Sequence, residues 1–315
     1  MQSVRQLLKV GVAVMRVQVP DLHAGHRYVI DHMSRVHSRS LIVLGYHGGM
    51  PTDRDPLTVE ERTEMIRESY KDPNLKIVSL RDHPFSHDRW SVWLDELVKK
   101  EFGEECQANM YGGAHDSFLD TYTGKFTKVP LTRFDESSGT AQRAAIVRSA
   151  GMSARERMIH FQIHRYPIAY SAEDVAIVDD QNERVLGIMK HWFDGRWSLP
   201  GGFLDPEKDI DDEAGARRER REELLGIKTT DVYLQLGKRI RVDDPRYRGS
   251  KDKIYTTLFA NQYRSGTAVG GDDAKGARWF NRNELRSMFV PWHLPLVERL
   301  EERWDILRSG RIDAA

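Results

Sequence analysis

Short apolar runs alternate with segments of helical spacing through the first half of the chain. The runs are rich in branched apolar residues, as buried strands are, and they cover residues 10–15, 41–45 and 75–80. Segments in which apolar residues recur at helical spacing follow them, at residues 27–37, 58–70 and 91–103. Strands and helices in this alternating order predict a parallel sheet with helices on its faces.

The second half of the chain has a different pattern. Two apolar runs that flank DDQNE, within residues 175–190, predict a β-hairpin. The loop sequence WSLPGGF and a charged helix at 209–226 follow, and strand-like runs such as 253–261 come later. A sheet, one long helix and more sheet indicate a mixed layered α/β fold.

The chain of 315 residues is long enough for two domains that each bury a core. A polar connection at 152–167 separates the two patterns, so we expect domains at 1–155 and 165–315. Equal numbers of basic and acidic residues, 48 of each, argue against general attraction to nucleic acid or to an anionic membrane. Lys9 and Arg16 interrupt the first apolar run, so we expect no secretory signal and a cytoplasmic protein.

The first candidate site is the sequence HAGH, residues 23–26, directly after the apolar run at 10–15. A helix that starts where a parallel strand ends points unpaired N–H groups outward, and these attract phosphate. Gly25 lets the backbone approach a ligand, and the imidazoles of His23 and His26 can donate hydrogen bonds to phosphate oxygens. Taken alone, the motif is equally compatible with ordinary loop histidines.

A second cluster supplies context at the other end of the first half. Ser138, Thr140 and Arg143 offer two hydroxyls and a guanidinium at the start of a predicted helix within 136–151, which also carries Arg148. These groups suit the outer phosphates of a triphosphate. The two motifs together are far more specific than either one alone.

These residues resemble the nucleotidyltransferases whose signatures are HxGH and a distal SxTxxR. Within that group the first half looks most like the nicotinamide mononucleotide adenylyltransferases, in the form that is fused to a Nudix domain. MRVQVPDLHAGH at 15–26 is similar to the family pattern GRFQPxHxGH, and residues 56–66 and 111–118 also resemble the family. Met15, Val17 and two extra residues before the first histidine depart from that pattern. The resemblance implies a Rossmann-like nucleotidyltransferase domain.

The resemblance also implies a reaction. A nucleotide phosphate would attack the α-phosphorus of ATP in line and expel pyrophosphate, so the protein mainly positions groups and neutralises charge. His23 and His26 would stabilise the charge that builds up in the transition state, with Mg²⁺ as counterion. The ATP and phosphate ligands would be Arg16, Gly25, Ser138, Thr140 and Arg143. Trp90 would stack on the nicotinamide ring, and the alternative is that Trp90 is a core residue.

The second candidate site lies on the charged helix. Glu219, Glu222 and Glu223 occupy relative positions 0, 3 and 4 and therefore share one face. Clustered carboxylates repel one another unless a hard divalent cation binds between them. The alternative is a solvated face that neighbouring arginines neutralise. The loop LPGGF at 199–203 favours the metal interpretation, because its glycines let metal and diphosphate approach the backbone.

Loop and helix together resemble the Nudix box, Gx5Ex7REUxEExGU, in which U is a bulky apolar residue. The residues that match its types are Gly202, Arg218, Glu219, Glu222 and Glu223. Arg218 lies 16 positions after Gly202, two more than in the box, and Lys208 replaces the glutamate of the loop. Arg220 stands at an apolar position, and Leu225 is an extra residue before the final glycine. Because the insertion lies in the loop, the helix keeps its internal spacing.

The Nudix resemblance implies an α/β/α sandwich that hydrolyses a diphosphate. The ligands of Mg²⁺, with Mn²⁺ as the alternative, would be Glu219, Glu222 and Glu223, and the ions would activate water. Arg218 would orient a glutamate, and the candidate catalytic residues are Glu222 and Glu223. In fused proteins of this type the substrate is ADP-ribose, which gives AMP and ribose 5-phosphate. Arg246 and Arg248, in DDPRYRG, would contact the substrate phosphates.

The sequence therefore predicts a bifunctional enzyme of NAD metabolism. It would make NAD and pyrophosphate from nicotinamide mononucleotide and ATP in one domain and hydrolyse ADP-ribose in the other, with these small nucleotides as its partners. Three alternatives stay open: another phosphate acceptor for the first domain, a degenerate first domain that leaves only the hydrolase, and a nucleotide-sensing regulator. The retained glutamates and the lack of a basic recognition helix argue against the regulator. The sequence leaves a homo-oligomer open.

Overall fold

The computed structural model describes residues 8–113, 117–132 and 139–308. The chain divides into two compact units, Met1–Tyr166 and Pro167–Ala315. Each unit has its own sheet and its own buried clusters of apolar side chains. The two units are described separately below.

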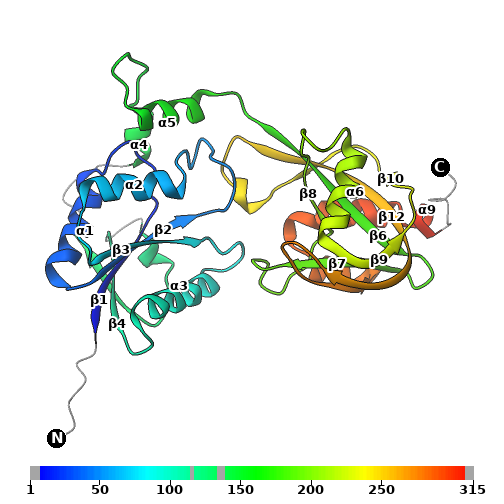
Figure 1. Ribbon diagram of the computed structural model, residues 1–315, viewed down its shortest axis with the longest axis horizontal. Coiled ribbons are helices and arrows are strands. Elements are labelled where there is room, and N and C mark those ends of the chain that lie inside the picture. The colour runs from blue at the N-terminus through cyan, green and yellow to red at the C-terminus, as the bar shows by residue number, and fades with distance from the viewer. Residues whose placement is uncertain (1–7, 114–116, 133–138, 309–315) are drawn as a thin grey trace, which may run out of the picture. The chain divides into compact units, whose positions relative to one another are not determined.

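The first unit is built on a sheet of five parallel strands in the order β3-β2-β1-β4-β5. The strands are β1 (Lys9–Met15), β2 (Ser40–Tyr46), β3 (Leu75–Arg81), β4 (Gln107–Gly113) and β5 (Thr127–Leu131). Figure 1 shows them side by side with helices packed against them. This Rossmann-like architecture confirms the predicted parallel sheet.

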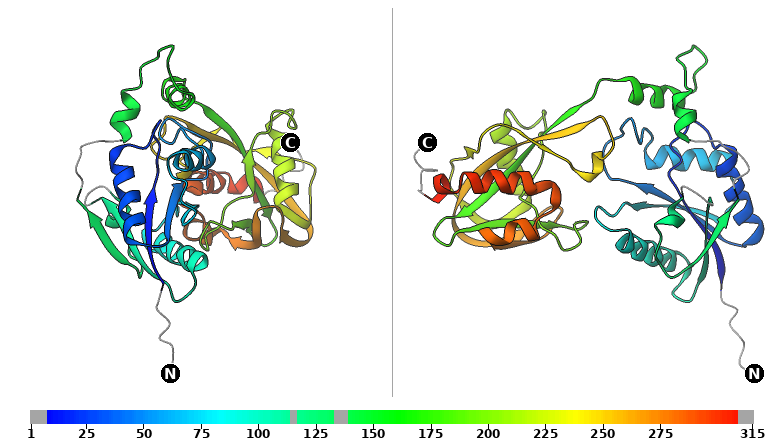
Figure 2. Two further views of the ribbon diagram at one scale, coloured as in Figure 1. Left: turned by 60° about the vertical axis from the view of Figure 1, so that its left-hand side comes forward. Right: turned by 180° about the vertical axis from the view of Figure 1, so that it is seen from behind.

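Helices cover both faces of this sheet. They are α1 (Ala24–Val36), α2 (Val59–Ser69), α3 (His87–Phe102), η1 (Phe118–Asp120) and α4 (Gly139–Ala144). Helices α1 and α2 lie on one face and α3 lies on the other (Figures 1 and 2). Alternation along β1 explains the arrangement, because Ala13 and Met15 join the cluster under α1 while Val10 and Val12 join the cluster under α3.

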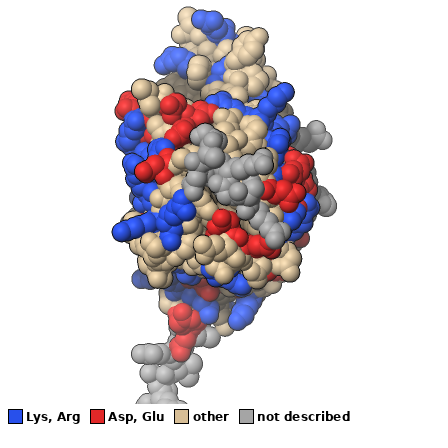
Figure 3. Space-filling model, turned by 90° about the vertical axis from the view of Figure 1, so that its right-hand side faces the viewer, with Lys and Arg blue, Asp and Glu red and all other residues tan. Residues whose placement is uncertain are grey.

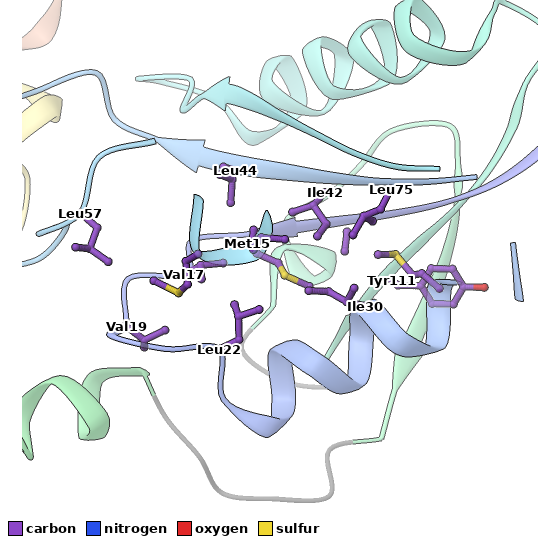
Figure 4. Close-up of a cluster of buried hydrophobic side chains, with 14 of the residues drawn as sticks. Met15, Val17, Val19, Leu22, Ile30, Ile42, Leu44, Leu57, Leu75 and Tyr111 are labelled. Carbon is purple, nitrogen blue, oxygen red and sulfur yellow. The ribbon is translucent and has the colours of Figure 1, made fainter. Parts of the chain in front are cut away.

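The loop between β1 and α1 is held by its own apolar side chains. Val17, Val19 and Leu22 are buried in the same cluster as Met15 and Ile30. Figure 4 shows these residues between the loop, helix α1 and the sheet. Burial of three side chains in so short a loop fixes the point at which α1 begins.

The polar connection at 152–167 contains a helix that the sequence analysis does not predict. Helix α5 (Ala154–His164) begins at Ser153, and the side chains of Ser153 and Glu156 form a capping box. The capping signal S-x-x-E accounts for the start of a helix within this polar connection. Conversely, α4 ends at Ala144. Arg148, which the sequence analysis places in this helix, therefore lies beyond its end.

The second unit contains a mixed sheet of eight strands, with the path β10-β12-β6-β7-β13. The strands are β6 (Ala169–Asp179), β7 (Arg184–Lys190), β8 (Gly201–Phe203), β9 (Leu224–Thr229), β10 (Leu234–Gln235), β11 (Ile240–Val242), β12 (Lys253–Gly270) and β13 (Ala274–Asn281). Strands β6 and β7 pair antiparallel, which confirms the hairpin around DDQNE. Strands β6 and β12 pair in parallel and form the centre of the sheet.

One long helix packs on each face of the second sheet. The helical segments are α6 (Asp212–Glu223), η2 (Pro245–Tyr247), η3 (Arg282–Glu284), α7 (Leu285–Met288), η4 (Pro291–His293), α8 (Leu294–Glu302) and α9 (Trp304–Arg308). Helix α6 lies on one face and α8 on the opposite face (Figures 1 and 2). Val175 and Ile177 of β6 pack in one cluster with Ala216 of α6. The layers are those of the predicted α/β/α sandwich.

The distribution of surface charge and the lengths of the helices relate to the expectation that neither nucleic acid nor a membrane is a partner. On the face shown in Figure 3, basic and acidic side chains are intermixed. Among the described residues, every helix is too short or too polar to span a lipid bilayer.

Candidate functional sites in the two units

In the first unit, His23 and His26 meet at the start of α1. His23 is the N-cap residue, and its Nδ1 atom accepts a hydrogen bond from the backbone N–H of His26 at 3.3 Å. The two imidazole rings stack with centroids 3.7 Å apart and planes inclined by 20°. Gly25 lies between them in the first turn and is half-buried. The structure thus brings the HAGH residues together at the carboxyl end of β1.

Arg16, the first residue after β1, is held by two carboxylates. Its Nη1 atom lies 3.5 Å from Asp55 Oδ1, and its Nη2 atom donates a hydrogen bond to Asp82 Oδ2. Burial alone would lower the pKa of Arg16, but Asp82 and Asp55 outweigh it and raise that pKa. His47 Nε2 lies 3.3 Å from the other oxygen of Asp55. A network of charged groups therefore lines the carboxyl edge of the first three strands.

The sequence analysis missed His47, Asp55 and Asp82 as parts of this site. His47 directly follows β2 and Asp82 directly follows β3, while Asp55 lies in the loop from β2 to α2. Burial opposes ionisation of Asp55, yet its hydrogen bond with His47 and the charge of Arg16 lower its pKa. Polar residues just past the ends of parallel strands were the signal that could have identified them.

The second motif packs on the loop of the first. Arg143 Nη1 donates a hydrogen bond to the carbonyl oxygen of Gln18 at 2.9 Å, and Nη2 lies 3.2 Å from Thr140 Oγ1. Burial lowers the pKa of Arg143. The structure therefore brings Thr140 and Arg143 to the segment between β1 and α1. Ser138, the first residue of the motif, lies outside the described residues.

Arg62 of α2 ties the strand ends together. Its side chain is 1 % exposed, and it donates hydrogen bonds to the carbonyl oxygens of Arg16 at 2.7 Å, Gly45 at 2.9 Å and Thr58 at 3.0 Å. Burial lowers the pKa of Arg62 to about 10. Directly after Arg16, Val17 has a φ of 48°, a left-handed conformation that is unfavourable for a β-branched residue. The carbonyl that precedes this strained residue is thus held by a buried cation.

Trp90 packs in the core of the first unit. It lies on α3 in the cluster with Leu94 and Val98, and its ring centroid is 6.4 Å from that of Phe118. This placement agrees with the core alternative and gives no support to stacking of Trp90 on a ligand. Trp93 is half-buried instead, and its ring lies 4.6 Å from the ring of His83, just after β3.

In the second unit, helix α6 carries all the glutamates of the second motif in one continuous stretch. The helix begins after Asp211, whose side chain accepts a hydrogen bond from the backbone N–H of Ala214 at 2.8 Å. It ends at Glu223, and β9 begins at Leu224 without a loop. The two extra residues between Gly202 and Arg218 are accommodated in the loop between β8 and α6, the extra Leu225 lies in β9, and the helical spacing is intact, as predicted.

Arg218 connects this loop with two of the glutamates. Its Nε and Nη2 atoms donate to the carboxylate of Asp209, and Nη2 also donates to the carbonyl oxygen of Phe203 at 3.0 Å. Its Nη1 atom lies 2.7 Å from Glu219 Oε1 and 3.0 Å from Glu222 Oε2. These hydrogen bonds, with Asp209 foremost, raise the pKa of Arg218. Arg218 therefore orients both glutamates toward a common point.

Gly202 leaves room for the carboxylate of Glu219. A Cβ atom at residue 202 would lie 2.5 Å from Glu219 Oε1, closer than side chains tolerate. Glu219 is mostly buried, and this burial raises its pKa although Arg218 opposes the shift. The carboxylate is thus pressed against the backbone of the LPGGF loop.

Glu223 lies deeper than its neighbours. Its Oε2 atom accepts a hydrogen bond from the backbone N–H of Gly201 at 2.6 Å, and its Oε1 atom lies 2.5 Å from Lys190 Nζ. Lys190 Nζ also lies 3.3 Å from Asp273 Oδ1. Burial raises the pKa of Glu223 against the opposing charge of Lys190. Glu222, in contrast, is half-exposed.

The three glutamates offer the oxygen donors that Mg²⁺ or Mn²⁺ prefers. As they stand, however, Glu219 and Glu222 share Arg218, and Glu223 is paired with Lys190. Within residues 8–113, 117–132 and 139–308, no group of three or more His, Cys, Asp or Glu side chains is arranged to hold a metal ion. The donor chemistry fits a divalent cation, while the present geometry is that of intramolecular ion pairs.

Arg246 lies beside the same loop, whereas Arg248 is exposed at the end of η2. Asp244 accepts hydrogen bonds from Arg246 through both carboxylate oxygens, at 2.8 to 3.1 Å. The guanidinium is 5.3 Å from the ring centroid of Phe203 and 5.7 Å from that of Trp192. Burial opposes the charge of Arg246, but Asp244 raises its pKa. Arg246 is therefore fixed between the rings of Phe203 and Trp192, and Phe203 directly follows Gly202 in the loop.

The sequence analysis also missed a pair of acidic residues inside strand β6. Glu173 is fully buried, and neither of its carboxyl oxygens has a hydrogen-bond partner among the described residues. Burial, then the charges of Asp212 and Asp209, raise its pKa to about 8. Asp174, on the other face, accepts a hydrogen bond from Thr256 Oγ1 at 2.7 Å. Two adjacent acids in an otherwise apolar strand were the available signal.

Comparison with known proteins identifies a family for the second unit. Residues 171–300 match the family model of the NUDIX domain, a range that contains β8, α6 and the residues around them. The second unit is therefore a Nudix domain, as the sequence predicts, and it follows a Rossmann-like unit in the same chain. A search of curated proteins gives no match.

The comparison with solved structures gives matches of low sequence identity. The chain is 18% identical to a bifunctional NMN adenylyltransferase/ADP ribose pyrophosphatase from Francisella tularensis, with 94% of this chain and 99% of that chain covered and a TM-score of 0.45. A structure described as the same kind of protein, with AMP and a Mn ion, is 16% identical over 94% and 99% of the two chains, with a TM-score of 0.43. The Nudix domain of Shewanella oneidensis NrtR, complexed with ADP ribose, is 21% identical over 49% of this chain and 99% of that chain, with a TM-score of 0.37.

Proposed function

We propose that the second unit hydrolyses ADP-ribose to AMP and ribose 5-phosphate. The observation that carries this proposal is the contact of the LPGGF loop with α6, where Gly202 leaves room for Glu219 and Gly201 donates to Glu223. This arrangement places carboxylates directly against a glycine backbone, where a diphosphate and its counterions can approach. The choice of ADP-ribose follows the sequence resemblance, and ADP ribose is also named for the Francisella and Shewanella proteins.

In this proposal Glu219, Glu222 and Glu223 hold Mg²⁺ or Mn²⁺, which would supply activation of water and neutralisation of the diphosphate charge. Arg218 sets the direction of the glutamate side chains through the hydrogen bonds described above. Arg246 presents a fixed positive charge beside the loop and contacts a substrate phosphate. The general base is not assigned.

The test for the second unit is hydrolysis of ADP-ribose with Mg²⁺, followed by product analysis. Glu222→Gln should abolish release of AMP, because it removes the charge of a half-exposed helix carboxylate without changing its size. The matched control is Glu207→Gln, which makes the same change at an exposed position of the neighbouring loop. Full activity of the Glu222→Gln variant would contradict the proposal.

We propose that the first unit transfers the adenylyl group of ATP to nicotinamide mononucleotide. The support is the convergence of the stacked pair His23 and His26 with Arg143 on the segment after β1. The mononucleotide phosphate attacks the α-phosphorus of ATP, the bond to the β,γ-diphosphate breaks, and pyrophosphate leaves with the electron pair. The imidazoles donate hydrogen bonds to the phosphate oxygens, and Arg16, Thr140 and Arg143 complete the set of polar groups.

The test for the first unit is formation of NAD from nicotinamide mononucleotide, ATP and Mg²⁺. His26→Ala should abolish NAD formation and leave ADP-ribose hydrolysis intact, and His160→Ala on α5 is the matched control. One observation favours a different acceptor or a degenerate first unit: the carboxylates of Asp55 and Asp82 already engage Arg16. Pyrophosphate release with another phosphate acceptor would favour a different acceptor. No pyrophosphate release with any acceptor would favour a degenerate first unit.

A further inference from the structure

Lys190 reaches the carboxylate end of α6 from the last position of β7. Its Nζ atom lies 2.5 Å from Glu223 Oε1 and 3.3 Å from Asp273 Oδ1. The side chain of Lys190 is 16 % exposed and that of Glu223 is 2 % exposed, whereas Asp273 is 49 % exposed. The ammonium group therefore bridges one buried carboxylate and one accessible carboxylate.

Both carboxylate oxygens of Glu223 are engaged in this arrangement. Its second oxygen accepts the hydrogen bond from the N–H of Gly201. Glu219, the nearest carboxylate along the helix face, is already paired with Arg218 and also feels the charge of Lys190. Each negative charge at this end of α6 thus has a cation supplied by the chain itself.

We infer that Lys190 is an internal cation that competes with the divalent metal ion for Glu223. This inference rests on the proposed hydrolase function of the second unit. An ammonium group 2.5 Å from Glu223 Oε1 and a divalent ion bound to the same carboxylate would repel each other strongly at this depth. Metal loading therefore requires Nζ to leave Glu223, and Asp273 is the accessible carboxylate toward which it moves.

The arrangement has a consequence for the protein without metal. A buried glutamate that lost this cation would be left as an uncompensated charge, which destabilises a fold strongly. Lys190 supplies that cation when metal is scarce. The same contact raises the metal concentration at which the site fills.

The experiment measures Mn²⁺ binding to the full chain, by electron paramagnetic resonance of free Mn²⁺ and by calorimetry. Lys190→Met should bind Mn²⁺ about tenfold more tightly, since tenfold is the effect of one modest electrostatic contact. Lys190→Arg retains the positive charge and should bind as the wild type does. Lys208→Met is the matched control, because Lys208 is exposed and pairs with Asp205 in the loop.

Asp273→Asn gives a second, opposite readout. Without the accessible carboxylate, Lys190 stays committed to Glu223, and Mn²⁺ binding should weaken. Thermal unfolding without metal should also show Lys190→Met to be less stable than the wild type, with the loss recovered when Mn²⁺ is added. If Lys190→Met does not fold without metal, Asp273→Asn and Lys190→Arg still test the inference.

Two failures can be distinguished. Equal or weaker Mn²⁺ binding by folded Lys190→Met, with binding that still depends on Glu219 and Glu222, would overturn the role of Lys190 and leave the hydrolase proposal standing. Mn²⁺ binding that is undetectable in the wild type and in every variant, or that survives Glu219→Gln and Glu222→Gln, would overturn the proposed metal site itself.

Discussion

The guanidinium of Arg143 donates a hydrogen bond to the backbone carbonyl oxygen of Gln18 at 2.9 Å, although the two residues are 125 positions apart. The side chain of Gln18 also holds Leu57 through two hydrogen bonds, one in each direction, at 2.8 and 3.1 Å. Gln18 therefore joins the loop after β1, the loop before α2 and the short helix α4. The candidate phosphate site of the first unit is assembled at this residue.

Gln18→Leu should destabilise the first unit and impair NAD formation. The substitution leaves the buried N–H and carbonyl groups of Leu57 without partners, at a cost of about 1–3 kcal/mol. Urea denaturation measures the stability and product analysis measures the activity. Gln107→Leu, at an exposed position of β4, is the control and should change neither. Unaltered NAD formation by Gln18→Leu would show that the junction does not position the site.

Arg62→Met should lower the stability of the first unit by about 3–5 kcal/mol, because it removes the charged donor shared by three carbonyl oxygens. Those oxygens belong to Arg16, Gly45 and Thr58. Chemical denaturation followed by circular dichroism gives the difference. Arg67→Met, at a half-buried position of the same helix, should cost far less. Equal losses for the two variants would refute a special role for Arg62.

Gly202→Ala should reduce ADP-ribose hydrolysis about a hundredfold, because the added methyl group displaces the Glu219 carboxylate by an ångström or so. The contact that causes the effect is the 2.5 Å separation between that methyl position and Glu219 Oε1. Gly276→Ala is the matched control, since nothing lies within 4 Å of a Cβ at that position. Steady-state kinetics of ADP-ribose hydrolysis by both variants measures the effect. A fully active Gly202→Ala variant would contradict the prediction.

Stability of the second unit should depend on pH through Glu173. Its folded-state pKa is about 8, above the ordinary value of a glutamate in the unfolded chain. Below the ordinary value the carboxyl is protonated in both states and the folded unit has its full stability. As pH rises toward 8, the unfolded chain releases the proton first, so the free energy of unfolding falls by on the order of a few kcal/mol and then levels off.

Hydrogen exchange of β6 peptides at several pH values measures this dependence in the full chain. Glu173→Gln should reduce it, because the amide keeps the shape of the side chain and does not titrate, while Glu223, whose pKa burial also raises, still contributes. Glu207→Gln, which changes an exposed glutamate, should leave the wild-type slope intact. A Glu173→Gln variant with the same slope as the wild type would assign the titration to another group.

The alternation of apolar runs was sufficient to predict β1, β2 and β3 of the first sheet and the hairpin around DDQNE, but it did not predict β4 and β5. It could not give the strand order β3-β2-β1-β4-β5, which depends on contacts between distant segments. Helix α5 was missed because its capping signal, Ser153 with Glu156, is local while the surrounding composition is polar. Length was overestimated for α4, which ends at Ala144.

Candidate site residues were predictable where they belong to a short motif, and not where a contact joins separate segments. His23 with His26, and Arg218 with Glu219 and Glu222, are close in sequence, and their contacts follow from helix geometry. The pairing of Lys190 with Glu223 joins a strand to a helix end, and a pattern of residue types along the chain does not encode such a contact.

Glu223 is the last residue of α6 and Leu224 is the first residue of β9, so no loop separates the two elements. This direct connection limits where the Nudix unit can accept inserted or deleted residues. The loop between β8 and α6 already holds two residues more than the motif, and its turn at Asp205 and Asp209 absorbs them. One residue inserted within α6 would instead rotate everything after it by about 100° around the helix axis. Insertions between the LPGGF loop and the glutamates are therefore tolerated before Asp211 and not within α6.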